Sequence, residues 1–346
     1  MRLLLATALV VSVATLAACN SSASPGTGES QNAKGQPIAV DLPRADSDFW
    51  NSYAKYIPQF AKDTGLNLMT PTNSQNDIAK LVANTQALTS QGAKAIVMAP
   101  QDTGAIATTL TQLEQKKIPV VTVDTRPDKG NVYMVVRADN RAYGQKACEF
   151  LGAKLGGKGK VVEFQGSLSS VNGRDRSEAF AECMSSKFPG ITVFAEPTDW
   201  EGAKASAALQ TRLAQHPDIN GIYMQAGGVF LAPTLQLLRT KNLLVPPSDP
   251  KHIFIVSNDG IPQEFDAIRK GEIDATVSQP ADLYAKYALF YAKAAVDGKT
   301  FQPGKTDHDS TIVQVRDGLL EDQLPAPLVT KDNVDDSALW GNQIGK

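Results

Sequence analysis

The chain has few histidines, no basic excess, and an opening apolar run that is too short to cross a membrane. Its three histidines stand far apart among 346 residues, which argues against a histidine-rich metal site. The formal net charge is −2, whereas proteins that bind nucleic acid usually carry a clear basic excess. The apolar run at 3–18 is shorter than the roughly 20 residues of a spanning helix. We therefore expect no metal, no cofactor and no nucleic-acid partner.

Catalytic motifs are missing as well. The chain contains no G-x-S-x-G nucleophile elbow. The nearest match to a phosphate-binding loop, "GAKLGGKG" at 152–159, has Gly159 where the motif needs a Ser or Thr hydroxyl, and it precedes a predicted strand instead of following one. We interpret this segment as a helix end and a turn, and we expect a protein that is not an enzyme.

Residues 1–19 have the features of a lipoprotein signal peptide. Arg2 precedes the apolar run, which ends in small residues as cleavable signals do. The sequence "LAAC" at 16–19 has the form of a bacterial lipobox, which predicts lipid attachment at Cys19; the alternative is an ordinary secretory signal with a chance cysteine. Residues 20–36 are rich in Ser, Gly and Asn and predict a flexible tether. We expect an exported chain, held by its lipid at the outer face of the cytoplasmic membrane or in the periplasm.

The other two cysteines are Cys148 and Cys183. Both lie in helical patterns, and helices on one face of a parallel sheet are neighbours, so a disulfide is geometrically possible. An exported protein reaches an oxidising compartment in which such bonds persist. We expect the disulfide; two buried thiols that act as small apolar residues are the alternative.

From residue 37 the chain alternates between short β-branched runs and amphipathic helical patterns. This alternation predicts an α/β protein whose parallel sheets carry helices on both faces. Hydrophobic residues make up 42% and charged residues 20% of the chain, a globular composition, and the length suits two domains. Because this number of strands is too large for one small sheet, we expect two doubly wound lobes. The predicted strands are 37–42, 66–70, 94–100, 118–124, 160–166, 191–196, 221–226, 252–259 and 274–279.

The chain should pass between the two lobes three times. We expect the N-terminal lobe to contain 36–138 and 280–308, and the C-terminal lobe to contain 139–279 and 309–346. Crossovers near 138, 279 and 309 would then form a three-strand hinge about which a ligand closes the lobes. The tail at 316–346 has a Pro-rich start and contains Trp340, and it should pack along a lobe surface.

Polar and aromatic residues recur where the predicted strands end, and in open α/β sheets ligands bind beyond these carboxyl ends. Carboxylates accept hydrogen bonds from hydroxyls, arginine donates a fixed fork, and flat aromatic faces pack on the C–H face of a sugar ring. The set therefore suits a neutral polyhydroxylated ligand, although each Asp could instead be a helix N-cap and each aromatic a core residue. The candidate ligand-binding residues are Phe49, Trp50, Asp124, Arg176, Trp200, Asn258, Asp259 and Gln279.

The same segments carry a family resemblance. Residues 37–315 resemble periplasmic sugar-binding proteins of the ribose-binding type, through "SDFW", "IPVVTVDTRPDKG", "GRDRSEAF", "AQHPDINGIYMQ" and "VSNDGIPQEFDAIRKGEIDATVSQ", in that order. The resemblance implies the type I periplasmic binding protein fold and a monomer that serves an ABC permease and its ATPase. It further implies that Phe49 and Trp50 lie on one side of a sugar and Trp200 on the other. Asp124, Arg176, Asp259 and Gln279 would bind hydroxyls.

Several positions depart from the ribose pattern. Ala99 and Ala226 stand where the ribose proteins carry asparagines, and Asn258 stands in place of a phenylalanine. The arginine expected directly after the first aspartate is Thr125, with Arg126 one place late. We therefore expect another pentose, a hexose or a polyol. A receptor for a sugar-like signal remains an alternative function, and a sugar-processing enzyme is a weaker one.

Overall fold

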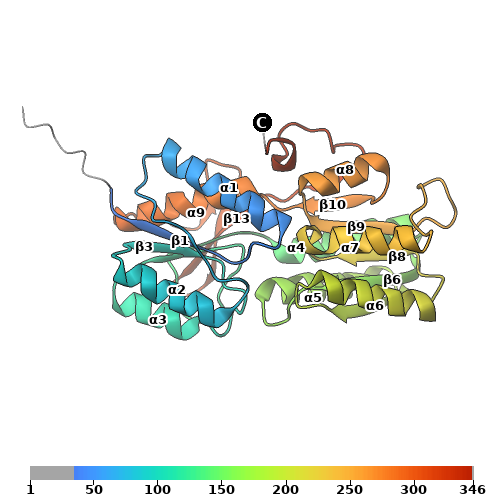
Figure 1. Ribbon diagram of the computed structural model, residues 1–346, viewed down its shortest axis with the longest axis horizontal. Coiled ribbons are helices and arrows are strands. Elements are labelled where there is room, and N and C mark those ends of the chain that lie inside the picture. The colour runs from blue at the N-terminus through green and yellow to red at the C-terminus, as the bar shows by residue number, and fades with distance from the viewer. Residues whose placement is uncertain (1–34, 345–346) are drawn as a thin grey trace, which may run out of the picture. The chain divides into compact units, whose positions relative to one another are not determined.

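The computed structural model describes residues 35–344. The predicted signal peptide, Cys19 and the tether up to residue 34 lie outside these described residues. Within 35–344 the chain forms two sheets, each with helices on both faces (Figure 1). The α/β class with two doubly wound lobes is therefore confirmed. No helix in the described part of the chain is both long enough and apolar enough to span a membrane.

The first lobe is built on an eight-stranded sheet. Its central strands are parallel, and β12 and β11 continue one edge in antiparallel pairing. One face packs against α1 (Asp48–Asp63) and α9 (Ala281–Val296), and the other against α2 (Ile78–Ser90) and α3 (Ala107–Gln115). In order across the sheet, the strands are β11 (Gly304–Lys305), β12 (Thr311–Arg316), β13 (Leu319–Leu324), β5 (Met134–Ala138), β4 (Val120–Val123), β3 (Ala95–Met98), β1 (Ile38–Leu42) and β2 (Thr72–Asn73).

The second lobe is built on a six-stranded sheet. Helices α4 (Asn140–Lys154) and α5 (Val171–Lys187) cover one face. Helices α6 (Gly202–Gln215), α7 (Gly227–Thr240) and α8 (Pro262–Lys270) cover the other. In order across the sheet, the strands are β14 (Leu328–Thr330), β10 (Ala275–Ser278), β9 (Phe254–Asp259), β8 (Gly221–Met224), β6 (Lys158–Gln165) and β7 (Gly190–Pro197).

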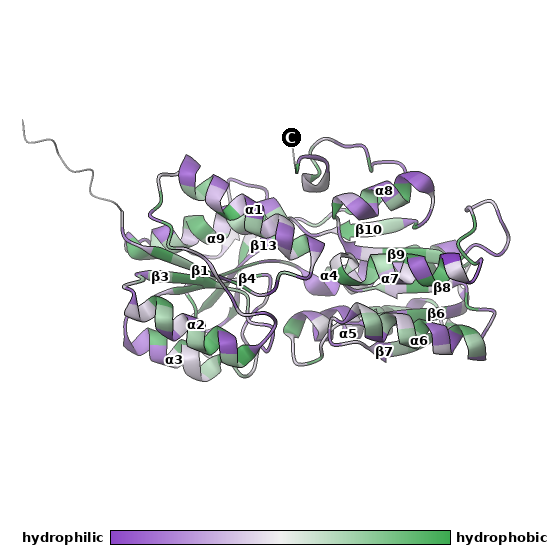
Figure 2. Ribbon diagram, viewed as in Figure 1, coloured by the Kyte–Doolittle hydropathy of each residue, from purple (hydrophilic) through white to green (hydrophobic). Residues whose placement is uncertain are grey.

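Local sequence accounts for these elements. Strands β3 (AIVM) and β4 (VVTV) are apolar and fully buried, as expected for parallel strands that are covered on both faces. The helices instead alternate polar and apolar residues along their length (Figure 2), because only one side of each faces a sheet. The carboxylates of Asp77 and Asp139 accept hydrogen bonds from the first amides of α2 and α4, which fixes where these helices begin.

The third crossover lies later than predicted. The chain passes between the lobes at residue 139, at 279–280 and at 325–327, because β13 pairs with β5 in the first sheet and β14 with β10 in the second. The predicted crossover near 309 is therefore wrong, and residues 309–324 belong to the first lobe. Strand β13 falls within the expected tail at 316–346, because its central residues Glu321, Asp322 and Gln323 are polar and lack the continuous apolar run that predicts a buried strand.

Two strand predictions also differ from the structure. Residues 66–70 do not form a strand: Leu68 makes an isolated bridge to Ile38, and pairing with β1 resumes only at β2. Strand β5 lies within a segment for which no strand was predicted. It is short, and it follows a turn that is rich in Asp, Lys and Gly.

Cys148 of α4 and Cys183 of α5 are joined by a disulfide, with 6.1 Å between their Cα atoms. The bond connects two helices that pack on the same face of the second sheet. It closes a loop with a sequence separation of 35.

We predict that the change Cys148→Ala/Cys183→Ala lowers the free energy of unfolding by about 4 kcal/mol, because the unfolded chain regains the freedom of this loop. Urea unfolding followed by circular dichroism measures the loss. Alkylation of the denatured, non-reduced parent followed by peptide mass spectrometry should label neither cysteine. Quantitative labelling of both would contradict the bond.

Candidate functional site

A small cavity of about 40 Å³ lies between the two lobes. Most of the residues around it are polar, and they come from strand ends and helix starts in both lobes. The first lobe contributes Arg44, Ser47, Phe49, Trp50, Gln101 and Asp124. The second lobe and its crossover contribute Ser170, Asn172, Arg176, Trp200, Ala226, Val229, Asp259 and Gln279.

Three aromatic side chains line this pocket. Phe49 and Trp50 open α1 of the first lobe, and their rings meet edge to face with centroids 5.2 Å apart. Trp200 comes from the second lobe, and a Cβ atom at Gly166 would lie 2.0 Å from its ring. Glycine at 166 is therefore required for the Trp200 ring to lie where it does. The adjacent pair Phe49 and Trp50 contributes to the core and to the pocket at once.

Asp124 follows β4 and faces the second lobe. One carboxylate oxygen accepts a hydrogen bond of 2.8 Å from the amide of Asn172 across the pocket. The other oxygen, Oδ1, is buried and has no partner among residues 35–344. Burial raises the pKa of this carboxyl, and the positive charges of Arg176 and Arg137 oppose the rise. The free oxygen is an acceptor that a bound hydroxyl can satisfy.

Asp259 ends β9 on the opposite side of the pocket. Its carboxylate accepts hydrogen bonds of 2.7 Å from the backbone amide of Gly228 and 3.2 Å from the side chain of Gln279. A side chain at 228 would collide with Ser47 of the first lobe, so this glycine permits the close approach of α7 and α1. Burial raises the pKa of Asp259 to about 7, although Arg176 acts in the opposite direction.

Arg176 is the more deeply buried of the two arginines that line the pocket, with a relative exposure of 2%. Its guanidinium donates hydrogen bonds to Asn140 at 2.6 Å, to Gln279 at 2.8 Å and to the carbonyl of Gln225. It also lies over the ring of Trp200, 5.7 Å from the centroid. These contacts hold the fork of donors in one orientation.

Three of the pocket residues have a positive φ angle. The values are 64° at Asp124, 61° at Trp200 and 126° at Asp259. A bulky residue such as tryptophan rarely adopts this region. Backbone strain of this kind concentrates at functional sites, where the surrounding structure maintains it.

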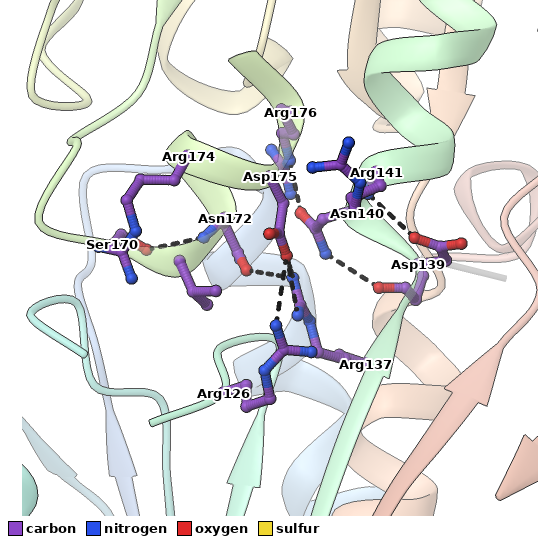
Figure 3. Close-up of polar contacts among 12 residues, drawn as sticks. Arg126, Arg137, Asp139, Asn140, Arg141, Ser170, Asn172, Arg174, Asp175 and Arg176 are labelled. Atoms are coloured by element: carbon purple, nitrogen blue, oxygen red, sulfur yellow. Dashed lines mark hydrogen bonds and ion pairs between the residues drawn. The ribbon is translucent and has the colours of Figure 1, made fainter. Parts of the chain in front are cut away.

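Behind the pocket, a buried ionic cluster connects the lobes (Figure 3). Arg137 of β5 and Arg126 of the first lobe both point toward Asp175 of α5 in the second. The guanidinium of Arg137 also donates a 2.8 Å hydrogen bond to Asn172, while Arg126 pairs with Glu321 at 3.0 Å. Arg126 stands one position after the place of the arginine in the ribose-type pattern. Its side chain belongs to this cluster and does not line the pocket.

The prediction for Asn258 is wrong. Its side chain donates to the hydroxyl of Tyr223 at 3.0 Å and to the carbonyl of Gln225 at 3.2 Å, and it does not line the pocket. The reason is the alternation of side chains along β9: Asp259 faces the pocket, and its neighbour points to the other side. The structure brings the remaining predicted ligand-binding residues together around one cavity.

Sequence reasoning missed three charged or amide side chains that line the pocket, Arg44, Gln101 and Asn172. Arg44 lies in the loop after β1, pairs with Asp46 at 2.6 Å, and donates to the carbonyl of Trp200 across the lobes. Asn172 lies in the first turn of α5. The only signal was their position in the loop or helix start that follows a strand, which they share with many residues of no special role.

Comparison with known proteins now identifies the family. The model of the periplasmic binding protein domain matches residues 38–300. This chain belongs to the periplasmic binding protein family. The ribose import binding protein of Salmonella typhimurium is 28% identical over 265 residues, which cover 77% of this chain and 86% of the relative. The predicted relation to the ribose-binding type is confirmed.

Two further similarities come from mycobacteria. The xylitol-binding protein of Mycolicibacterium smegmatis is 25% identical over 291 residues, covering 84% of this chain and 76% of the relative. A crystal structure of an ABC transporter solute-binding protein from Mycobacterium smegmatis with bound glycerol matches with a TM-score of 0.74 and 25% identity. That match covers 86% of this chain and 95% of the other.

The carboxyl groups of the pocket should make the stability of this periplasmic binding protein depend on pH. Burial raises the pKa of Asp259 to about 7 and that of Glu264, which lies nearby, to about 8. Both values exceed those of the unfolded chain, which are near 4. The folded chain therefore binds the protons of these two carboxyls more tightly than the unfolded chain does. Their contribution to the free energy of unfolding is complete below about pH 4, and it is lost as the pH rises through 7 and 8.

We predict that Asp259→Asn reduces the loss of stability at rising pH in the ligand-free protein. Between pH 5 and pH 8, the free energy of unfolding of the parent should fall by about 1–3 kcal/mol more than that of the variant. Urea unfolding at a series of pH values measures the difference. If the free energy of unfolding changes equally with pH in the two proteins, Asp259 is ionised at both ends of this range.

Proposed function

We propose that this protein captures a neutral sugar or polyol between its two lobes and delivers it to an ABC importer, without catalysing a reaction. The observation that carries the proposal is a pair of buried polar atoms, on two residues that line the pocket, that have no hydrogen-bond partner among residues 35–344. They are Oδ1 of Asp124, an acceptor, and Nε1 of Trp200, a donor. A hydroxyl group donates and accepts, so a polyhydroxylated ligand can satisfy both.

The charges around the pocket favour a neutral ligand. Two arginines, Arg44 and Arg176, face two carboxylates, Asp124 and Asp259, so the pocket has no large excess of either sign. Its small volume argues against an oligosaccharide. The relatives support the same class, since they include a ribose import protein, a xylitol-binding protein and a structure with bound glycerol.

Ribose itself is disfavoured. The asparagines that ribose-binding proteins carry at two strand ends are Ala99 and Ala226 here. Ala226 lines the pocket beside Val229, so this part of the wall is apolar. We propose that the ligand is a pentose other than ribose, a hexose or a polyol that presents C–H groups to this wall.

The site changes should weaken binding without unfolding the lobes. A thermal-shift panel of pentoses, hexoses and polyols identifies the ligand, because binding to the folded state raises Tm. We predict that Asp124→Ala and Asp259→Ala each weaken binding of that ligand by about 10–1000-fold, since each leaves a buried hydroxyl unpaired. Isothermal titration calorimetry measures Kd.

The matched control is Asp218→Ala, an exposed carboxylate that pairs with Lys160 away from the pocket. It should bind as the parent does. Parent-like affinity in both pocket variants would refute the site, and no binding by the parent across the panel would refute the ligand class.

Delivery requires that the protein stays near its importer. We propose that Cys19 carries a lipid and that residues 20–36 form a tether. The two lobes would then stay at the outer face of the membrane that holds the permease, whose ATPase works on the inner side. The lipobox sequence "LAAC" supports the anchor, and the Ser- and Gly-rich segment after it supports the tether.

We predict that Cys19→Ala abolishes lipid attachment. Metabolic labelling with palmitate and membrane fractionation of the expressing cells measure it. The variant should take up no label and leave the membrane fraction, whereas Cys148→Ala/Cys183→Ala should be labelled as the parent is. A labelled Cys19→Ala protein would contradict the lipobox interpretation.

A further inference from the structure

The C-terminal segment 331–344, here called the strap, is clamped to the second lobe. It follows β14 and ends in the short helix η1 (Trp340–Asn342). Arg269 of α8 donates to the carboxylate of Asp335 at 2.8 Å and to the side chain of Asn342 at 2.8 Å. One arginine thus holds the strap at two points.

Buried apolar residues also attach the strap to the second lobe. Val334 and Leu339 are buried in the cluster formed by α6, α7 and α8 of the second lobe. Gly341 lies against α8 so closely that a Cβ atom there would be 2.7 Å from the ring of Phe265. The strap is therefore part of the second lobe and moves with it.

At its end, however, the strap contacts the first lobe. The side chain of Trp340 is 3% exposed and belongs to the apolar cluster of α1 and α9. Its ring meets the ring of Phe49 edge to face, with centroids 6.1 Å apart and an interplanar angle of 82°. Phe49 also lines the pocket, so Trp340 lies directly behind a residue of the candidate ligand site.

The strap also supports the pocket from the side of the second lobe. A Cβ atom at Gly341 would lie 2.4 Å from the carbonyl oxygen of Gly260. Gly260 directly follows Asp259, whose carboxylate faces the pocket. One short segment thus touches the backs of two pocket elements, Phe49 in one lobe and 259–260 in the other.

We propose that the strap is a positioning element of the ligand pocket, in which Trp340 holds Phe49 and the start of α1 against the second lobe. This inference rests on the proposed function, because it assigns the strap to the same pocket. Trp340 touches no ligand in this scheme. It acts by fixing the place of a ring that does, and it links the lobes when they are closed.

The first test needs no ligand. In Trp340→Ala, hydrogen–deuterium exchange should become faster in the amides of residues 51–56, which begin with the bond from Asn51 to the carbonyl of Ser47. Trp340→Phe keeps an aromatic ring and should exchange as the parent does. Leu113→Ala is the control for general destabilisation, because Leu113 is buried on the opposite face of the first sheet. It should lower Tm and leave exchange in this segment unchanged.

The second test uses the sugar or polyol found in the thermal-shift panel. Trp340→Ala should weaken binding by roughly 3–10-fold, as expected for the loss of one aromatic contact, whereas Trp340→Phe and Leu113→Ala should bind within about twofold of the parent. Parent-like exchange or parent-like affinity in Trp340→Ala overturns the positioning role. If the parent binds nothing in the panel, the proposed function fails, and the exchange data alone decide the role of the strap.

Discussion

The guanidinium of Arg176 is a full positive charge with 2% exposure, and a buried charge is tolerated only when it is paired and hydrogen-bonded. Three of its donors are occupied within the second lobe and its crossover, by Asn140, Gln225 and Gln279. The carboxylate of Asp259 faces this charge from the same lobe. The first lobe adds one charge of each sign to the pocket, Asp124 and Arg44, so the two lobes meet with their charges paired and without a large excess of either sign.

Much of the fold could be predicted from sequence, because parallel strands buried on both faces are nearly continuous apolar runs. Convergence of Asp259 and Gln279 followed from the same geometry, since the carboxyl ends of β9 and β10 meet at one edge of the second sheet. Asp124 follows a strand of the other sheet, so its approach to them depends on how the two lobes face each other. Edge strands gave a weaker signal. Strand β12 is mostly exposed or half-buried, and β13 has the polar residues Glu321, Asp322 and Gln323 at its centre, so the place of this hairpin in the first sheet, and with it the third crossover, depended on long-range pairing that the local pattern does not encode.

The errors within the site have a similar physical origin. Asn258 and Asp259 are adjacent, and only the orientation of β9 decides which of them faces the pocket. Asn172 matters because it bonds to Asp124 across 48 positions of sequence, and no local pattern marks such a partner. The positive φ of Trp200 is likewise invisible to propensity arguments, because tertiary contacts, here the close packing on Gly166, maintain it.

The structure shows where two departures from the ribose pattern, Ala99 and Ala226, lie relative to the pocket. Ala99 is buried in the apolar core and does not line the pocket. The side chain of Gln101, two residues later, does line it, and its amide donates to the carbonyl of Ala99 at 3.2 Å. In the second lobe, Ala226 and Val229 form a small apolar part of the wall. Polar side chains remain on both sides of the pocket, with Gln101 and Asp124 in the first lobe and Asn172, Asp259 and Gln279 in the second, so the departures from the ribose pattern change individual contacts and leave the polar character of the pocket in place.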